Sequence, residues 1–201
     1  MMLGIGQDII DVFSGMGDVG MLIAFAVIIW IDGTASPTLP EVWMIFIFGV
    51  HADSFMWGAA VVLVASVASL AGNFTLYYLV KAAKLPKRVQ KAMKAYTNWL
   101  ILKDERLLIL NRFAPLIPYT GAFIAACNWN LKKCAVYIFT SAIAKFSFYI
   151  VIIWFSFESL EDDIAPWVSL AIVAVVILAS VIASVWYRKK QSVGGEPSRS
   201  P

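Results

Sequence analysis

Three long apolar runs decide which folds are open to this chain. They cover residues 56–80, 134–157 and 167–186, and together they contain one charged residue, Lys145. The hydrocarbon core of a bilayer is about 30 Å thick and needs roughly 20 apolar residues to cross it as a helix. Charged residues make up 14% of the 201 residues, about half of their usual share in soluble domains. The sequence therefore predicts an all-α integral membrane protein.

The basic residues indicate how these runs are oriented. All sixteen lysines and arginines lie at or beyond position 81, and the cytoplasmic loops of membrane proteins collect such residues. The segments predicted to be cytoplasmic are residues 81–94, 132–133 and 188–190. The turn at residues 51–53 and the acidic residues 158–163 are predicted to lie on the other side. The three runs then pass inward, outward and inward, which places the C-terminus in the cytoplasm.

Residues 107–127 form a further apolar stretch that cannot cross the membrane once. Basic residues flank it on both sides, so the charge pattern places both of its ends in the cytoplasm. We therefore predict that it enters and leaves the membrane from one side, as a re-entrant hairpin that turns at Pro115 and Pro118. Non-helical backbone at that depth is tolerated where protein buries it or where it lines a wet cavity.

The first half of the chain carries a matching pattern. Pro37 and Pro40 separate two short apolar stretches, residues 20–31 and 42–50. Each Pro-x-x-Pro is followed by about ten apolar residues, a polar break and a full-length run, and the two runs have opposite predicted orientations. The pattern predicts an inverted-topology repeat with two re-entrant helical hairpins and about three to four full spans.

Three segments are predicted along the chain. Residues 1–19 form an amphipathic N-terminal segment, residues 20–187 form the membrane domain, and residues 188–201 form a basic, disordered cytoplasmic tail rich in Gly, Pro and Ser. The basic segment that follows residue 81 is predicted to contain a helix lying in the membrane interface, because it carries apolar residues at helical spacing. These apolar residues are Val89, Met93, Tyr96 and Leu100.

Four ionisable residues lie within or beside the predicted membrane elements: Asp32, Glu41, Arg112 and Lys145. Charged groups at membrane depth are costly, so they usually face the interior of a bundle and mark a substrate or proton pathway. We therefore take these four as candidate substrate-binding residues. The alternatives are a structural ion pair between Glu41 and Arg112, a Lys145 side chain that extends to the interface, and an Asp32 that caps the next helix or lies among headgroups.

The remaining polar and sulfur-containing residues are typical of packing. Gly72 and Asn73 fit a close helix approach and a hydrogen bond between helices, and the free thiols of Cys127 and Cys134 fit buried packing. His51 is the single histidine, and neither a nucleophile–base pair nor a set of metal ligands is apparent. We expect no enzyme activity, no metal and no cofactor. The net charge of +3 is confined to the membrane flanks, which favours lipid headgroups over nucleic acid as partners.

Three segments of the chain resemble the DedA / VTT-domain family, also called the SNARE-associated Golgi protein family. They are residues 37–41 (Pro-Thr-Leu-Pro-Glu), 72–77 (Gly-Asn-Phe-Thr-Leu-Tyr) and 112–119 (Arg-Phe-Ala-Pro-Leu-Ile-Pro-Tyr). The resemblance covers about residues 30–155, and the Pro-x-x-Pro-Tyr form looks closer to the eukaryotic, TVP38-type branch. Asn73 stands where the family has Asp, and Pro118 stands where bacterial members have a second arginine.

The resemblance implies movement of lipids across a bilayer, since members recycle polyprenyl phosphates in bacteria and scramble phospholipids in eukaryotes. We therefore expect a flippase- or scramblase-like transporter of an anionic or phosphate-bearing lipid, in the plasma membrane of a prokaryote. Arg112 would pair with the lipid phosphate, because a guanidinium matches phosphate oxygens. Glu41 would hold Arg112 in the empty site or exchange a proton, and Lys145 would add positive potential.

Other functions remain open at this point. A small-solute or ion exporter could use the same hairpins, and a non-catalytic membrane assembly factor would not depend on Glu41 or Arg112. An integral-membrane lipid phosphatase or transferase would need a nucleophile and a base within reach of each other. Protons or another coupling ion, and a homo-oligomer, are also open.

Overall fold

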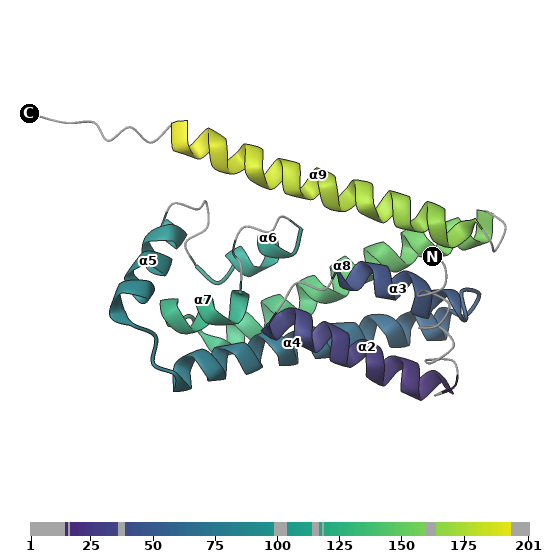
Figure 1. Ribbon diagram of the computed structural model, residues 1–201, viewed down its shortest axis with the longest axis horizontal. Helices are drawn as coiled ribbons and strands as arrows, with labels where there is room; N and C mark the ends of the chain where they lie inside the picture. The colour runs from purple at the N-terminus through teal and green to yellow at the C-terminus, as the bar shows by residue number, and fades with distance from the viewer. Residues whose placement is uncertain are drawn as a thin grey trace, which may run out of the picture.

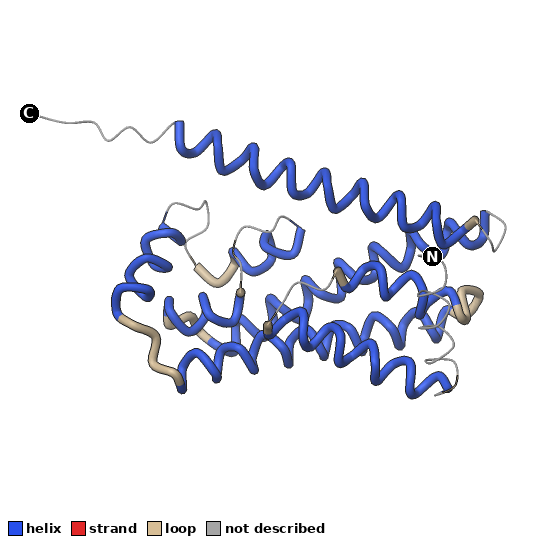
Figure 2. Tube along the Cα trace, viewed as in Figure 1, coloured by secondary structure: helices blue, strands red, loops and turns tan. Residues whose placement is uncertain are grey.

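In the part of the chain that it describes, the computed structural model consists of helices joined by loops, with no strand, which confirms the predicted all-α class for that part (Figure 2). The described residues are 15, 17–35, 39–98, 104–113, 117, 119–159 and 164–193. Their helices are α2 (Gly17–Thr34), α3 (Pro40–Gly49), α4 (Phe55–Ala82), α5 (Lys87–Asn98), α6 (Leu107–Phe113), α7 (Thr120–Cys127), α8 (Leu131–Ser159) and α9 (Ala165–Val193). Pro37, Pro115 and Pro118 lie outside the described residues, as does most of the predicted N-terminal segment.

Three of the described helices, α2, α4 and α8, are long and apolar enough to cross a membrane. Helices α4 and α8 have 28 and 29 residues, so each is about 42 Å long at 1.5 Å per residue. That length exceeds the roughly 30 Å of hydrocarbon in a bilayer. The length and composition of these helices mark the chain as an integral membrane protein.

Helix α2 is longer than the apolar stretch predicted from the sequence. That stretch covered residues 20–31, whereas the helix begins at Gly17 and ends at Thr34. The polar end is accommodated because the Thr34 hydroxyl donates to the carbonyl of Trp30, one turn back, at 2.7 Å. Asp32 therefore lies inside α2. Capping of α3 was one alternative for this residue, and it does not occur, because Leu39 is the N-cap of α3.

Helices α4 and α8 form the centre of the molecule and run antiparallel (Figure 1). One core cluster joins the first half of α4, including Val61, to the second half of α8, including Phe146 and Ile153. A second cluster joins the other halves, with Phe74 of α4 packed near Ile138 of α8. The antiparallel packing places the end of α4 beside the start of α8.

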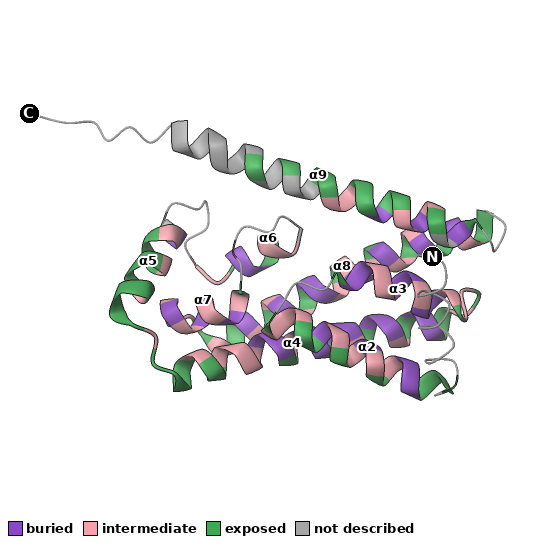
Figure 3. Cartoon of the chain, viewed as in Figure 1, coloured by how far each residue is buried: buried purple, intermediate pink, exposed green. Residues whose placement is uncertain are grey.

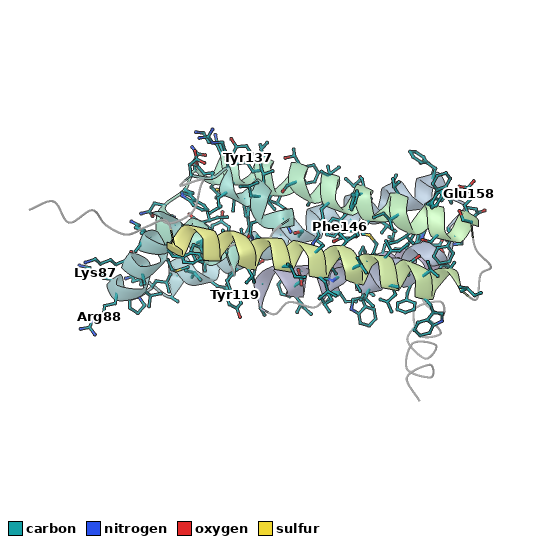
Figure 4. All side chains as sticks on the ribbon, turned by 90° about the horizontal axis from the view of Figure 1, so that it is seen from above. Lys87, Arg88, Tyr119, Tyr137, Phe146 and Glu158 are labelled. Atoms are coloured by element: carbon teal, nitrogen blue, oxygen red, sulfur yellow. The ribbon has the colours of Figure 1, made fainter. Side chains whose placement is uncertain are left out.

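Basic and acidic side chains are separated along the long axis of the molecule. Lys87 and Arg88 at the start of α5 lie at one end, and Glu158 near the end of α8 lies at the other (Figure 4). The end of α4 carries Lys81 at the basic end, and the start of α8 adds Lys132 there. Basic residues of α4, α5 and α8 thus gather at one end of the molecule, and Glu158 lies at the other.

Helices α2 and α3 form a helical hairpin, called here the first hairpin, whose two ends meet. Asp18 at the start of α2 and His51 just after α3 lie 3.0 Å apart, measured from Oδ1 to Nε2. The end of α2 packs on the second half of α4, where Trp30 Nε1 donates to Thr75 Oγ1 at 3.0 Å. Helix α2 thus runs alongside α4 in the same direction, and α3 returns to its starting level.

Helices α6 and α7 form the second hairpin, and its ends meet in the same way. The backbone N–H of Asn130, after α7, donates to Glu105 Oε1, before α6, at 3.0 Å. Near the tip, Asn111 Nδ2 donates to Thr120 Oγ1 at 3.1 Å, and Asn111 Oδ1 accepts from the N–H of Ile117 at 2.7 Å. The arms have 7 and 8 residues, or about 11 Å each, so neither could cross a membrane.

The two hairpins enter their second arms through the same backbone conformation. Leu39 precedes α3 with φ 49°, and Tyr119 precedes α7 with φ 51°. Both residues lie in the left-handed region, which non-glycine residues seldom adopt. Each hairpin is followed by a capped long helix: Ser54 Oγ accepts from Trp57 N–H in α4, and Asn130 Oδ1 accepts from the first turn of α8. The described chain therefore contains two hairpin-and-long-helix units in antiparallel orientation.

Helix α5 packs across the second hairpin and exposes its basic face (Figure 3). Met93 and Tyr96 pack against the second core cluster, and the Tyr96 ring lies 6.0 Å from that of Phe123 in α7. The helix predicted in this basic segment is therefore present, and Leu100, the last apolar residue assigned to it, lies outside the described residues. Lys81, assigned to the same segment, belongs to the end of α4.

Helix α9 is longer at its C-terminal end than the sequence predicted. The basic, disordered tail was predicted to begin at residue 188, but the helix ends at Val193. Lysine and arginine are good helix formers, and they are favoured near a helix C-terminus. The first strong helix breakers in the sequence are Gly194 and Gly195, so the helix has no reason to end earlier.

Candidate functional site at the hairpin tips

The best-defined polar contact inside the bundle joins the first hairpin to α8. Glu41, in the first turn of α3, is 4% exposed, and its Oε1 lies 2.5 Å from Lys145 Nζ. The carboxylate is also favoured by the positive end of the α3 dipole. The Lys145 side chain is 18% exposed, so it points into the bundle and does not extend to the interface, which was one alternative for this residue.

The second hairpin makes a corresponding contact with α4. Arg112, near the end of α6, donates from Nη2 to the Ser69 hydroxyl at 2.7 Å. The carboxylates of Asp32 and Glu41 both interact electrostatically with this guanidinium. The structure thus brings together all four ionisable residues singled out from the sequence. These four residues and Ser69 are called here the hairpin-tip cluster.

The salt bridge observed in the cluster differs from the ion pair that the sequence analysis offered as one alternative. That alternative paired Glu41 with Arg112, whereas the salt bridge of Glu41 is to Lys145. Sequence spacing could not distinguish the two cations, because both are predicted at similar depth and the choice depends on which face of α8 points toward α3. The cluster holds two carboxylates and two cations, so its formal charge is zero.

The two contacts occupy equivalent positions in the two hairpin-and-long-helix units. Ser69 is the fifteenth residue of α4, and Lys145 is the fifteenth residue of α8. Each hairpin therefore contacts the long helix of the other unit: Glu41 reaches α8, and Arg112 reaches α4. At 1.5 Å per residue, both contacts lie about 21 Å from the start of their long helix, close to its midpoint.

Tyr149 and Ser69 belong to the site but were not predicted. The Lys145 ammonium lies 5.8 Å from the centroid of the buried Tyr149 ring, a distance suited to a cation–π contact. Tyr149 also interacts electrostatically with Glu41. Ser69 is uncharged, so it was not among the ionisable residues taken as candidates. It occupies the same position in its long helix as Lys145 does in α8. This equivalence is the feature that could have identified it.

Gly72 and Asn73 lie where α2 packs on α4. A Cβ added to Gly72 would come within 2.5 Å of the Trp30 carbonyl oxygen and 3.1 Å of Gly33 Cα, so the helices approach as closely as glycine allows. The Asn73 amide was expected to bond between helices. It donates instead to the Ser69 carbonyl within α4 at 2.8 Å.

The hydrogen-bond donors of the cluster are those of Arg112 and Lys145. They lie in the same part of the bundle as the buried Glu41 carboxylate. Among the described residues, no group of three or more His, Cys, Asp or Glu side chains is arranged to hold a metal ion. Of the four hairpin prolines, Pro40 alone is described, as the buried first residue of α3. Cys134 is buried and Cys127 is partly buried.

Comparison with known proteins adds no relative to this picture. No family model matches the chain, and neither the curated proteins nor the solved structures contain a match. The assignment of a function therefore rests on the geometry of the hairpin-tip cluster.

Proposed function

We propose that this chain moves an anionic, phosphate-bearing lipid across a membrane, with the hairpin-tip cluster as its headgroup site. The observation that carries the proposal is the pair of crossed contacts, Glu41 with Lys145 and Arg112 with Ser69, at the midpoints of two helices long enough to span a bilayer. Ionisable groups at such depth are costly and usually serve transport. The resemblance to lipid-moving DedA / VTT-domain proteins agrees with this assignment.

We infer that both hairpins re-enter the membrane, although α2 has the length of a full span and the shorter stretch expected from the sequence did not. In the first hairpin, the contact between Asp18 and His51 closes the open end, while Glu41 near the tip reaches the middle of α8. In the second hairpin, the contact between Glu105 and Asn130 closes the open end, while Arg112 reaches the middle of α4. If α4 and α8 cross the membrane, both hairpin tips lie near its midplane and the two open ends lie at opposite surfaces. This is the geometry of an inverted repeat.

The crossed contacts suggest how an anion would be handled. A phosphate entering the cluster would accept hydrogen bonds from the Arg112 fork and compete with Glu41 for the Lys145 ammonium. Glu41 would then lose its cationic partner, Lys145. Binding of the headgroup would thus loosen the contact that holds the first hairpin to α8, and departure of the headgroup would restore it.

The lipid-facing surface also offers a place for acyl chains. A groove of about 670 Å³ lies between the first half of α4 and the second half of α8. Apolar side chains make up most of its lining, including those of Val62, Leu63, Ile150 and Trp154. An apolar groove would not bind a small polar solute. The groove therefore favours a lipid over the small-solute alternative.

The proposal can be tested with purified protein in liposomes that carry labelled lipids with several headgroups. Arg112→Ala should slow the change in leaflet exposure of an anionic lipid by about 10- to 100-fold, the effect of losing a charged hydrogen bond. Arg112→Lys should restore it poorly, because lysine lacks the bidentate fork. Arg106→Ala is the matched control, since Arg106 lies just before α6, is exposed and pairs with Asp104.

Each competing function predicts a different result. Full activity in Arg112→Ala would contradict the headgroup role and favour an assembly factor. Movement of a small solute without movement of lipid would favour an exporter. Mass spectrometry of the recovered lipid should show unaltered chemical structure; protein-dependent dephosphorylation or headgroup exchange would indicate an enzyme.

A further inference from the structure

A polar cavity lies at the basic end of the molecule, away from the hairpin-tip cluster. It has a volume of about 210 Å³, about that of seven water molecules. The end of α4, the start of α5 and the end of α7 surround it. Its polar lining comes from Tyr77, Lys81, Lys84, Gln90 and Asn128.

The two lysines that line this cavity, Lys81 and Lys84, are both exposed and differ in their contacts. Lys81 Nζ donates to the Tyr77 hydroxyl at 3.2 Å and lies 5.4 Å from the centroid of the Tyr77 ring. Lys84 forms the sharp turn between α4 and α5, where its φ of 49° lies in the left-handed region. Gln90 Nε2 donates to the Leu85 carbonyl at 3.1 Å and thereby fixes the start of α5 against the turn. The cavity is therefore built from three elements that hold each other in place.

None of the described residues that line this cavity is a carboxylate. On the loop before α6, Asp104 pairs with Arg106 at 2.7 Å, and Glu105 accepts from the backbone of Asn130. The exposed side chains of Lys87, Arg88 and other basic residues of α5 add positive potential at this end of the molecule. The lining described for the cavity is therefore positively charged.

We propose that this cavity binds a phosphate-bearing group through Lys81 and Lys84. The ligand is either the headgroup of an anionic phospholipid or a free phosphate ester, which share this chemistry. The position favours contact with the membrane surface, because α5 packs its apolar residues on α7 and presents basic residues outward. Lys84 is fifteen residues beyond Ser69, or about 22 Å along a helix. The site is therefore separate from the hairpin-tip cluster, and it stands whether or not that cluster moves lipid.

Binding to the full-length protein in detergent tests the proposal. The probes are short-chain phosphatidic acid, glycerol phosphate and short-chain phosphatidylcholine, and the readout is the dissociation constant from a fluorescence or thermal-shift titration. Wild type should bind phosphatidic acid, and Lys81→Ala/Lys84→Ala should bind it at least about tenfold more weakly, as expected for loss of charge-assisted hydrogen bonds. Lys132→Ala/Lys133→Ala is the matched control, because it removes two exposed lysines of α8 that do not line the cavity.

The outcomes separate the ligand sources and the competing explanations. Equal binding of glycerol phosphate and phosphatidic acid would identify a free phosphate ester, and binding of phosphatidic acid alone would identify a lipid headgroup. Failure of wild type to bind phosphatidic acid or glycerol phosphate, or an equal loss in both double variants, would overturn the proposal in favour of no site or of general surface attraction. Lys81→Gln and Lys84→Gln, tested singly, should each weaken binding because they remove the charge and keep a polar side chain. They serve if the double alanine variant does not fold.

Discussion

Removal of Lys145 should destabilise the protein strongly, because it leaves a buried carboxylate without its cation. At the 2.5 Å separation of Lys145 Nζ and Glu41 Oε1, two unit charges attract by about 7 kcal/mol at an effective dielectric constant of about 20. Desolvation of each ion costs several kcal/mol, so the intact pair contributes little net stability. Loss of one partner from a buried pair typically costs about 3–5 kcal/mol.

A double-mutant cycle measures this effect directly. Lys145→Met should lower the free energy of unfolding in mixed detergent micelles by about 3 kcal/mol or more, whereas Glu41→Gln/Lys145→Met should recover most of the loss. Lys133→Met, which replaces an exposed lysine in the same helix, should change it by less than about 0.5 kcal/mol. A Lys145→Met protein as stable as the Lys133→Met control, or strict additivity in the double variant, would refute the buried pair.

Three further predictions follow from other parts of the fold. Gly72→Ala should lower the unfolding free energy by about 1–3 kcal/mol, because the new methyl group meets the Trp30 carbonyl at 2.5 Å; an unchanged value would show that α2 and α4 are not in close contact. Hydrogen bonding from the Asn130 backbone lowers the pKa of Glu105 below its ordinary value of 4.5. This bond therefore stabilises the protein at neutral pH and is lost as the pH falls through the lowered pKa, so the stability difference between wild type and Glu105→Gln should shrink below about pH 4.5. In a background without the native cysteines, cysteines replacing Lys84 and Lys132 should be labelled from one side of oriented vesicles, and a cysteine replacing His51 from the other; labelling of 84 and 132 from opposite sides would exclude the re-entrant second hairpin.

The long helices could be predicted from the sequence because their signal is large and local. The apolar runs at residues 56–80 and 134–157 fall within α4 and α8. The second hairpin followed from a less direct argument, in which basic residues bracketed a segment too interrupted to cross. The all-helical class is thus set by hydrophobicity and charge, which act over whole segments.

Helix ends and side-chain partners were harder to predict because they depend on tertiary contacts. Helix α2 continues to Thr34 since its polar end bonds within the fold. The selection of Lys145 as the partner of Glu41 depends on the rotation of α8 about its axis, which apolar runs do not determine. Ser69 carries no charge, so its place in the site emerges only when Arg112 is seen to donate to it.

The crossed contacts set a physical condition on any motion of the hairpins. Glu41 ties the first hairpin to α8, and Arg112 ties the second hairpin to α4, so neither unit can shift as a rigid body without breaking a buried polar contact. Breaking the first contact separates Glu41 from Lys145, and breaking the second removes a hydrogen bond from the Arg112 guanidinium. Either change is costly in a buried region unless another group replaces the lost partner. Under the proposed function, an anionic headgroup between Arg112 and Lys145 would be that replacement for both cations. Motion of the hairpins would then be coupled to occupancy of the site, because the ligand would lower the cost of opening these contacts.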